Sequence, residues 1–436
     1  MKTDHMDRMT LLPEEYERIL VIKRDLHMHP ELAKTEYRTS GVIRSFLEEL
    51  PCVELLQTGT PTGVLARIEG DGSGTEIALR ADIDALAQTE RYESPWKSCN
   101  EGVMHACGHD FHTASLLGAA LILSRIKAEG RLANTVDLIF QPAEEGTTGA
   151  RSLLDAGLFD RIHPSAIFGI HNWPSVESGK IVLHEGALMA AKRNMTIRIR
   201  GRGGHGSMPH LNVDPIVCAA AVIQSLQTIV SRNTDPMEAL VLSISRIEGG
   251  SPANRVADQV EMNATIRSLS DEVLDRGISR TQAVVSNIAS AYECTWEIDW
   301  EERIPAVTNR PEMEKAARVA AEAAAPGCMT DAAPSLASED FALYGQSVPS
   351  WFFWVGSRTP GEPAEDLHRP MFHTDDRAMR QAAQLYAAAA MITRKDQREA
   401  AQPDPRPEGT KGGNLHDHRL PCSEIQTHRS PETPEN

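Results

Sequence analysis

The stretch TEIALRADIDAL, residues 75–86, is apolar from Ile77 to Leu79 and becomes acidic at Asp82 and Asp84. A short apolar run that ends in charged groups is consistent with a buried β-strand. The stretch therefore predicts a strand that places two carboxylates at its carboxyl end.

Two further stretches show the same transition from apolar to polar residues. TVDLIF, residues 135–140, runs directly into QPAEEG, and SAIFGI, residues 165–170, runs directly into HNWP. A helical pattern that follows Phe111 and is closed by Gly130 precedes both. Strands that alternate with helices favour a mainly parallel α/β sheet. Because open sheets of this kind bind ligands at the carboxyl ends of their strands, we expect the site there.

The alternation changes near residue 187. Residues 187–303 have the pattern of a few antiparallel strands with two helices, which predicts a compact α+β insert. We therefore expect a two-domain α/β protein. Its main domain would comprise residues 1–186 and 304–396, and a smaller lid domain would comprise residues 187–303. Residues 397–436 are rich in proline, glycine and charge, which predicts a disordered tail.

Composition restricts the classes of partner. The 436 residues include 44 Lys and Arg against 61 Asp and Glu, a formal net charge of −17. This balance disfavours nucleic acid and anionic membranes as general partners. No run approaches the roughly 18 apolar residues of a membrane span, and the charged start lacks a secretory signal, so we expect a cytoplasmic protein. The seven scattered cysteines are expected to be reduced thiols rather than a disulfide framework.

The stretch MHACGHDFHTASLLGAA, residues 104–120, holds the first candidate metal ligands. Cys107 and His109 are two residues apart, so both side chains can point the same way, and thiolate and imidazole bind zinc and similar metals. Glu145 follows one predicted strand, His171 ends another, and His368 precedes the last predicted helix. Each alone has an ordinary structural explanation. Together they supply the mixed sulfur, nitrogen and oxygen ligands of a two-metal hydrolytic site.

The adjacent residues Glu144 and Glu145 are expected to have different roles. Neighbouring carboxylates repel each other unless a cation offsets them, so we expect Glu145 to bind metal and Glu144 to act as the general base. Histidine ligands need acceptors that fix their tautomer, and Asp82, Asp84 and Asp110 are candidates. Cysteine favours Zn²⁺, whereas the carboxylates also accept Mn²⁺, Co²⁺ or Ni²⁺.

The stretch GRGGHGSMPH, residues 201–210, has two interpretations. Its glycines match the pattern G-x-G-x-x-G of dinucleotide-binding proteins. That motif needs a helix that begins within the glycines and an acidic residue about 20 positions later. Here Pro209 postpones the helix, and no such acidic residue is found at a second strand end. We therefore interpret the stretch as a glycine turn that presents His205, a donor for the oxyanion formed when water attacks an amide.

Motifs spread over residues 20–395 resemble the metal-dependent aminoacylase and carboxypeptidase family, and specifically its amidohydrolase branch with hippurate hydrolase and the plant auxin-conjugate hydrolases. The matching stretches are KRDLHMHPEL, ALRADIDAL, MHACGHDFHTASLLGAA, FQPAEEGTTGAR, IHNWP, GRGGHGSMPH, SEDFALY and LHRPMF. The resemblance implies two divalent ions at the five ligands named above, Glu144 as base and His205 as the lid histidine. It also implies a lid that often mediates homodimers, and it gives Asn254 a role in holding the substrate carboxylate.

The chain departs from the family's pattern at two places. Ala87 stands where proline is usual, and NRVA, residues 254–257, stands where NVIP is usual. Neither change touches a proposed ligand, but both can alter the shape of the pocket.

The sequence thus predicts an enzyme that hydrolyses the amide bond of N-acyl amino acids, small molecules, to a carboxylic acid and a free amino acid. A dipeptidase or carboxypeptidase with the same two-metal site is the close alternative. A non-catalytic metal-binding or scaffold protein is the distant one, and it is disfavoured because Glu144 and His205 would serve only catalysis.

Overall fold

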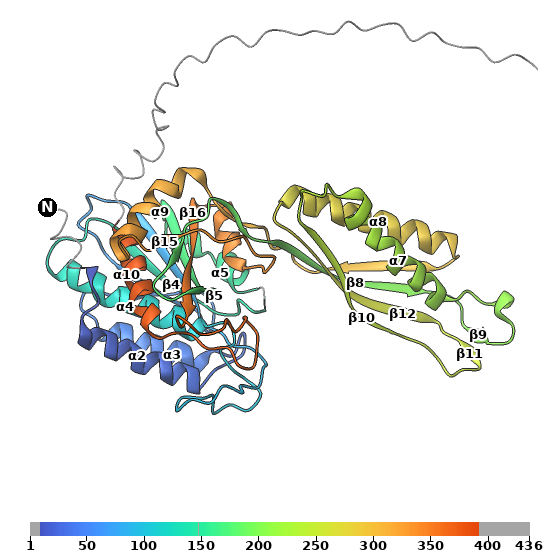
Figure 1. Cartoon of the computed structure of the whole chain (residues 1–436), viewed down its shortest axis with the longest axis horizontal. Helices are drawn as coiled ribbons and strands as arrows, with labels where there is room; N and C mark the ends of the chain where they lie inside the picture. Colours follow the sequence, from blue (N-terminus) through green and yellow to red (C-terminus); the bar gives the residue numbers. More distant parts are fainter. Residues whose placement is uncertain (1–8, 147, 392–436) are drawn as a thin grey trace, which may run out of the picture. The chain divides into compact units, whose positions relative to one another are not determined.

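The computed structural model describes residues 9–146 and 148–391 of the chain (Figure 1). The helices of this part are α2 (Pro13–Met28), α3 (Tyr37–Glu48), α4 (His109–Ala128), α5 (Gly149–Asp155), α6 (Leu158–Arg161), α7 (Pro215–Asn233), α8 (Asp271–Ala291), α9 (Pro311–Ala324) and α10 (Arg377–Ala390), with the 3₁₀ helices η2 (Pro209–Leu211) and η3 (Asp340–Gln346). The predicted tail, residues 397–436, lies outside the described residues.

The strands form one large sheet, one smaller sheet and two short pairs. Their bounds are β1 (Glu54–Leu56), β2 (Val64–Ile68), β3 (Glu76–Asp82), β4 (Thr135–Gln141), β5 (Ala166–Glu177), β6 (Ile181–Val182), β7 (Gly186–Met189), β8 (Ala191–Arg200), β9 (Gly204–His205), β10 (Leu240–Gly249), β11 (Arg255–Val256), β12 (Gln259–Ser268), β13 (Thr295–Trp300), β14 (Val307–Asn309), β15 (Met329–Thr330) and β16 (Ser350–Arg358).

The large sheet has the order β1-β2-β4-β3-β5-β16-β6-β15. The central strands β4, β3, β5 and β16 run parallel to one another, whereas β2 and β6 join the sheet antiparallel to β4 and β16. The mainly parallel α/β sheet predicted from the sequence is confirmed. The strand over TEIALRADIDAL ends at Asp82, where the sequence becomes acidic.

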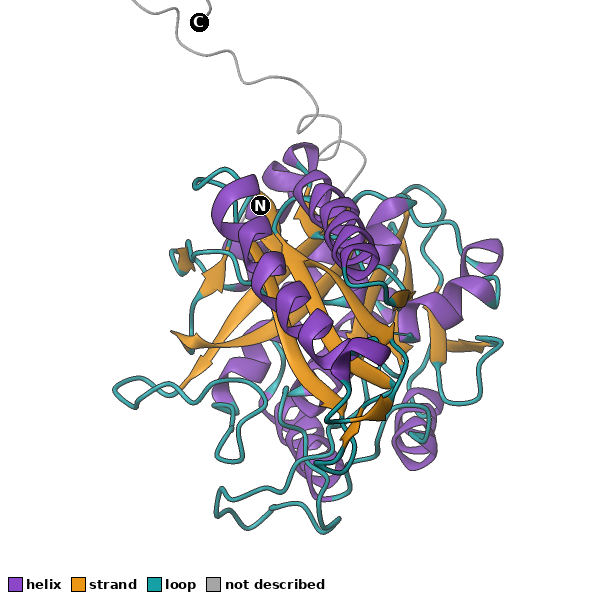
Figure 2. Ribbon diagram, turned by 90° about the vertical axis from the view of Figure 1, so that its right-hand side faces the viewer, coloured by secondary structure: helices purple, strands orange, loops and turns teal. Residues whose placement is uncertain are grey.

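Helices cover both faces of this sheet (Figure 2). Side chains alternate between the faces along each strand. In β3, Ile77 and Leu79 pack into the core that contains α2, α3, α4, α9 and α10, whereas Ala78 packs into a second core with α5, α6 and η3. Arg80 and Asp82 share the parity of Ala78 and therefore face the second core.

The smaller sheet has the order β10-β12-β8-β13 and is antiparallel throughout. Its strands pack on α7 and α8 around a hydrophobic core of their own, which includes Met195, Ile197 and Val222. The strands and helices expected within residues 187–303 are therefore present. Their separate status as a lid domain, and the boundaries given above, stay predictions.

Candidate metal centre

Two of the proposed ligands, Glu145 and His171, lie near the level at which the central strands β3 and β4 end. β4 ends three residues before Glu144, His171 lies within β5, and α4 begins at His109. Because β3, β4 and β5 are parallel, these ends lie at one edge of the sheet. The chain order therefore brings distant ligands together.

Cys107, His109 and His171 form the buried part of the cluster. The Cys107 Sγ lies 3.4 Å from the His171 Nε2. The possible ligand atoms of these three residues all lie within 4.8 Å of one another, which is close enough to hold one ion.

Glu145 and His368 complete the cluster on its more exposed side. The His368 Nε2 lies 3.3 Å from the Glu145 Oε1, and the Glu145 Oε1 lies 3.8 Å from the His109 Nε2. Cys107, Glu145 and His368 form a second group of possible ligand atoms within 4.8 Å, and His109, Glu144 and Glu145 form a third. The structure thus brings together all five predicted ligands and the predicted base.

Asp84 holds several of these groups in position. Its Oδ1 lies 3.2 Å from the His109 Nδ1 and accepts the Glu144 N–H at 3.0 Å, and its Oδ2 accepts the Glu145 N–H at 3.0 Å. A carboxylate only accepts, so the His109 Nδ1 donates to Asp84, and Nε2 is the ring nitrogen left for a metal ion. Asp84 therefore orients a candidate ligand in the way that a metal site needs.

Three residues with left-handed backbone shape the site. Ala143 has a φ of 57° immediately before Glu144, and His368 has a φ of 61°. Such values are uncommon for residues other than glycine and mark backbone that its surroundings hold in place. Gly108, with a φ of 86°, precedes α4, and a Cβ there would lie 2.0 Å from the Asn172 Oδ1. Only glycine fits between Cys107 and His109.

The unpaired atoms of the cluster fit a divalent cation. Among the described residues, the buried His109 Nε2 has no hydrogen-bond partner, and the buried Glu145 Oε1 has only its ionic contact with His368. Buried polar atoms without partners are costly, and both are of a type that binds metal. The donor set of thiol, imidazole and carboxylate therefore fits metal, and zinc in particular.

Proton affinities in the cluster lead to the same conclusion. Burial, and next the charge of Glu145, raises the pKa of the Cys107 thiol well above its usual range. Burial alone would lower the pKa of His109, but the charges of Asp82 and Asp84 outweigh it and raise that pKa to about 10. Binding of a cation by Cys107 and His109 would therefore have to displace protons from these two side chains.

Arg80 joins the cluster to a buried acidic network that the sequence analysis missed. This fully buried guanidinium contacts Asp82 at 2.9 Å, Glu339 at 2.9 Å and Asp340 at 3.1 Å. The Asp340 N–H donates to the Glu144 Oε1 at 3.4 Å. Burial, and next the charge of Glu339, raises the pKa of Glu144 well above its usual range. The alternation of β3 places Arg80 and Asp82 on one face, which was the available signal.

Asp110 is a correction to the sequence analysis. Its carboxylate lies 2.9 Å from the His27 Nδ1 and 3.7 Å from the Lys23 Nζ, and no contact joins it to a proposed ligand among the described residues. Neighbouring residues on a helix point about 100° apart, so Asp110 points away from the side that His109 faces.

His205 and Asn254 lie beside each other, and no hydrogen bond or ion pair in the described part of the chain joins either to the cluster. β9 and β11 pair there, and the Gly206 N–H donates to the Asn254 carbonyl at 2.8 Å. The His205 Nδ1 accepts the Ser207 N–H at 3.2 Å, which leaves Nε2 free to donate. Both side chains are exposed. Their predicted roles stay predictions.

Two cations on the smaller sheet were also missed. Lys192 in β8 and Arg267 in β12 are directly opposite in the register. Lys192 is only 8% exposed, and neither residue forms an ion pair within residues 9–146 and 148–391. Burial, and next the charge of Arg267, lowers the pKa of Lys192, although Glu144 opposes the shift. Only the strand register could have revealed this pair.

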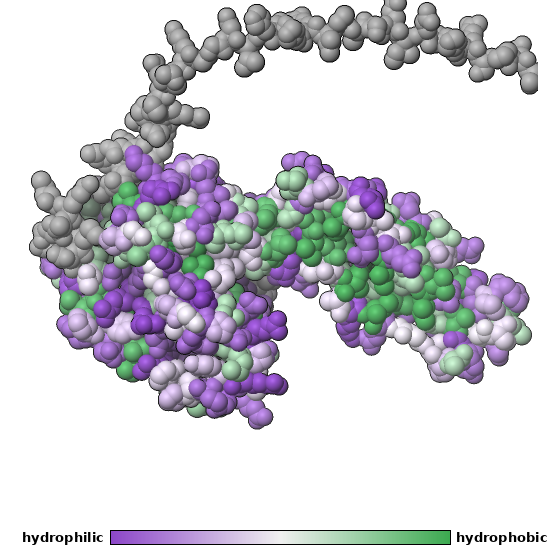
Figure 3. Space-filling model, in the orientation of Figure 1, coloured by the Kyte–Doolittle hydropathy of each residue, from purple (hydrophilic) through white to green (hydrophobic). Residues whose placement is uncertain are grey.

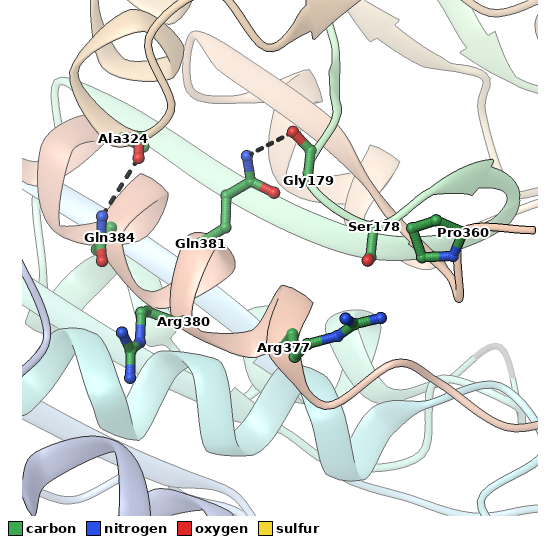
Figure 4. Close-up of a pocket in the computed structure, with 8 residues that line it drawn as sticks. All are labelled: Ser178, Gly179, Ala324, Pro360, Arg377, Arg380, Gln381 and Gln384. Carbon is green, nitrogen blue, oxygen red and sulfur yellow. Dashed lines mark hydrogen bonds between the residues drawn. The ribbon is translucent and has the colours of Figure 1, made fainter. Parts of the chain in front are cut away.

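A pocket of about 380 Å³ lies elsewhere, beside α10 (Figure 4). Several of its polar groups have partners in the protein. The Gln381 Nε2 donates to the Gly179 carbonyl, the Gln384 Nε2 donates to the Ala324 carbonyl, and Arg377 pairs with Asp375. No proposed ligand lines it, so the pocket is not part of the metal centre.

Comparison with known proteins gives the family. The model of peptidase family M20/M25/M40 matches residues 78–392. An N-acetylcysteine deacetylase of Bacillus subtilis is 41% identical over 86% of this chain and 96% of the relative. Thermostable carboxypeptidase 1 of Saccharolobus solfataricus is 34% identical over 86% and 94%.

A solved structure agrees with this assignment. A Bacillus subtilis protein described as a dinuclear metal binding peptidase of the M20 family is 38% identical, with a TM-score of 0.75 over 87% of this chain and 98% of that one. This chain therefore belongs to peptidase family M20/M25/M40, and it is a hydrolase that acts on amide bonds.

We predict that Cys107→Ala and Glu145→Ala each lose bound metal. Each removes a ligand atom from the cluster, so affinity should fall by more than the ~10–100-fold that loss of a residue orienting a ligand costs. Inductively coupled plasma mass spectrometry after dialysis measures this. Cys99→Ala, which removes an exposed thiol, is the matched control. Because the Cys107 thiol has a raised pKa, wild-type affinity should also weaken as pH falls. Full occupancy in Cys107→Ala would contradict the assignment.

Proposed function

We propose that this protein is a two-metal amidohydrolase that cleaves N-acyl amino acids. The observation that carries the proposal is the convergence of the possible ligand atoms of Cys107, His109, Glu145, His171 and His368, with Glu144 beside them. The deacetylase relative, at 41% identity, supports an acylated amino acid as substrate.

The five clustered residues would hold the two ions. Bound divalent ions supply Lewis acidity that polarises an amide carbonyl and makes water more acidic. Thiolate favours Zn²⁺, whereas Mn²⁺, Co²⁺ and Ni²⁺ remain compatible with the carboxylate and imidazoles.

Glu144 would move the proton. Its carboxylate lies close to possible ligand atoms of His109 and Glu145. It belongs to neither of the two sets of possible metal ligands that contain Cys107. Its raised pKa suits a carboxylate that accepts a proton from water and gives it to the leaving nitrogen. His205 would donate from Nε2 to the developing oxyanion.

Lys192 and Arg267 would bind the carboxylate of the amino-acid half. Like charges directly opposite on neighbouring strands destabilise a sheet, and an anion between them removes that cost. Both belong to the face of the smaller sheet opposite its hydrophobic core, because Met195 and Ile197 alternate with Lys192. Asn254 would add an uncharged hydrogen bond to the same carboxylate.

The alternative is a carboxypeptidase or dipeptidase. It is favoured by the carboxypeptidase relative, at 34% identity, and it would use the same ligands, base and carboxylate site. The two activities differ only in the group that is cleaved from the amino acid's nitrogen. That group is a simple acyl group in an N-acyl amino acid and an aminoacyl group in a peptide.

Residues 187–303 would form a homodimer through α7. This helix exposes large apolar side chains, including Ile216 and Val217, and hydrophobic residues gather over α7 and the neighbouring strands (Figure 3). By length and composition α7 could also span a membrane, with 33% of its most apolar stretch buried, but one such helix is weak evidence. A partner subunit would cover the surface equally well. A cytoplasmic location stays a prediction.

The function predicts a clear order of substrates. Metal-loaded protein should hydrolyse N-acetyl and N-benzoyl amino acids faster than dipeptides of the same C-terminal residue, as measured by amine release.

Glu144→Gln should keep its metal and lose ~10²–10⁴-fold in kcat, because it cannot take the proton. Preference for dipeptides would favour the alternative, and an unchanged kcat in Glu144→Gln would reject its role as base.

Lys192→Met should raise KM for an N-acetyl amino acid ~10-fold or more, since hydrogen bonds to charged groups contribute about 1.5–3 kcal/mol. The matching N-acetyl amino acid amide, which lacks the carboxylate, should be hardly affected. Because the pKa of Lys192 is lowered, KM of the wild type should rise at alkaline pH before an ordinary lysine would lose its charge. Lys192→Arg should abolish that rise. Equal effects on both substrates would exclude the carboxylate site.

Val217→Asp on α7 should convert the dimer to monomer in size-exclusion chromatography with light scattering, because it places a charge on the proposed interface. Val319→Asp on α9 is the matched control, since the two valines are 51% and 49% exposed. A wild type that is monomeric at micromolar concentration, or a dimer that survives Val217→Asp, would refute the proposed interface.

A further inference from the structure

His112 is one of the two histidines of the stretch MHACGHDFHTAS, with His105, that the proposed function does not use. It is fully buried and lies three residues after His109 on α4, on the same side of the helix. Its ring centroid lies 4.6 Å from that of His171 and 5.4 Å from that of His109. It therefore packs directly against two candidate ligands.

Both ring nitrogens of His112 are engaged by the protein. The Nε2 accepts the backbone N–H of Asn172 at 2.9 Å, so this nitrogen bears no proton. The proton is then on Nδ1, which donates to the Asp82 Oδ1 at 2.6 Å. Arg80 holds the other oxygen of Asp82 at 2.9 Å. The tautomer of His112 is fixed, and no lone pair is left for a metal ion.

Asn172 transmits this constraint to His171. The His171 Nδ1 lies 2.6 Å from the carbonyl oxygen of Asn172, and a carbonyl only accepts. His171 therefore bears its proton on Nδ1 and has its lone pair on Nε2, the atom that lies 3.4 Å from the Cys107 Sγ. Asn172 is fully buried against Gly108, so its backbone has little freedom to move.

We propose that His112 is a positioning residue that holds His171 in the orientation for metal binding, through the backbone of Asn172. It acts as a spacer of fixed length between the Asp82 carboxylate and the strand that carries the ligand. This inference rests on the proposed metal centre. It goes beyond the five proposed ligands, because it makes His112 necessary for metal affinity although His112 does not bind metal itself.

The two amide variants of His112 separate its two bonds. The Asn side chain can donate to Asp82 in place of Nδ1 but does not reach the Asn172 N–H, whereas the Gln side chain extends to the position of Nε2 and can accept that N–H. We expect His112→Asn to weaken Co²⁺ binding ~10–100-fold, as the loss of residues that orient metal ligands does. His112→Gln should recover most of this loss.

The readouts do not depend on turnover. Competition with a chelator gives Co²⁺ affinity, and the thiolate-to-cobalt absorption band reports the ion beside Cys107; the band should change in His112→Asn. Thermal unfolding of the metal-free proteins identifies general loss of structure, which would lower stability in both variants alike. Unchanged affinity and spectrum in a folded His112→Asn would overturn the inference. Loss of one metal equivalent in both variants would also overturn it, because His112 would then be a ligand.

A measurement on the wild type covers the case in which neither variant folds. Nitrogen-15 NMR of labelled histidine in the Zn²⁺-loaded protein should show His112 with its proton on Nδ1 and an unmetallated Nε2. A proton or a metal on the Nε2 of His112 would overturn the inference. If the wild-type protein binds no divalent ion at all, the proposed function itself is rejected. If the wild type binds metal and substitution of His112 does not change the affinity, only the positioning role is rejected.

Discussion

The carboxylate of Asp84 accepts hydrogen bonds from the His109 imidazole and from the backbone N–H groups of Glu144 and Glu145. These donors come from the start of α4 and from the turn after β4, two segments that no strand pairing joins directly. A buried carboxylate with fewer hydrogen-bond donors would lower the stability of the fold by several kcal/mol. The two segments are therefore held where all three donors reach Asp84. The position of the base relative to the ligands follows from this one group.

The parallel sheet makes that arrangement possible. β3 delivers Asp82 and Asp84 to the same edge at which β4 delivers the glutamates and β5 delivers His171. Left-handed residues then bend the chain sharply enough to turn the side chains inward. The strain at Ala143 and His368 is of the order of 1 kcal/mol or more each, and the surrounding contacts offset it.

Periodicity and strand-end polarity predicted the large sheet, the main helices and the residues of the metal cluster, because these signals lie within single short segments. Orientation did not follow from them. Asp110 has the right chemistry and a neighbouring position, but the helix turns it toward His27. The roles proposed for His112, Lys192 and Arg267 depend on which ring nitrogen is protonated and on which residues are opposite across two strands. Neither property is encoded in local spacing, so only the folded chain reveals them.

The burial of Cys107 has a consequence for the chemistry of the protein before metal arrives. Oxidants attack thiolate far more readily than thiol, and a buried thiol with a raised pKa remains almost entirely in the unreactive form. The Cys107 thiol is thus protected from sulfenic acid formation by the same environment that raises its pKa. A cation held by Cys107 would bind the thiolate form, and its coordination would occupy the lone pairs of the sulfur.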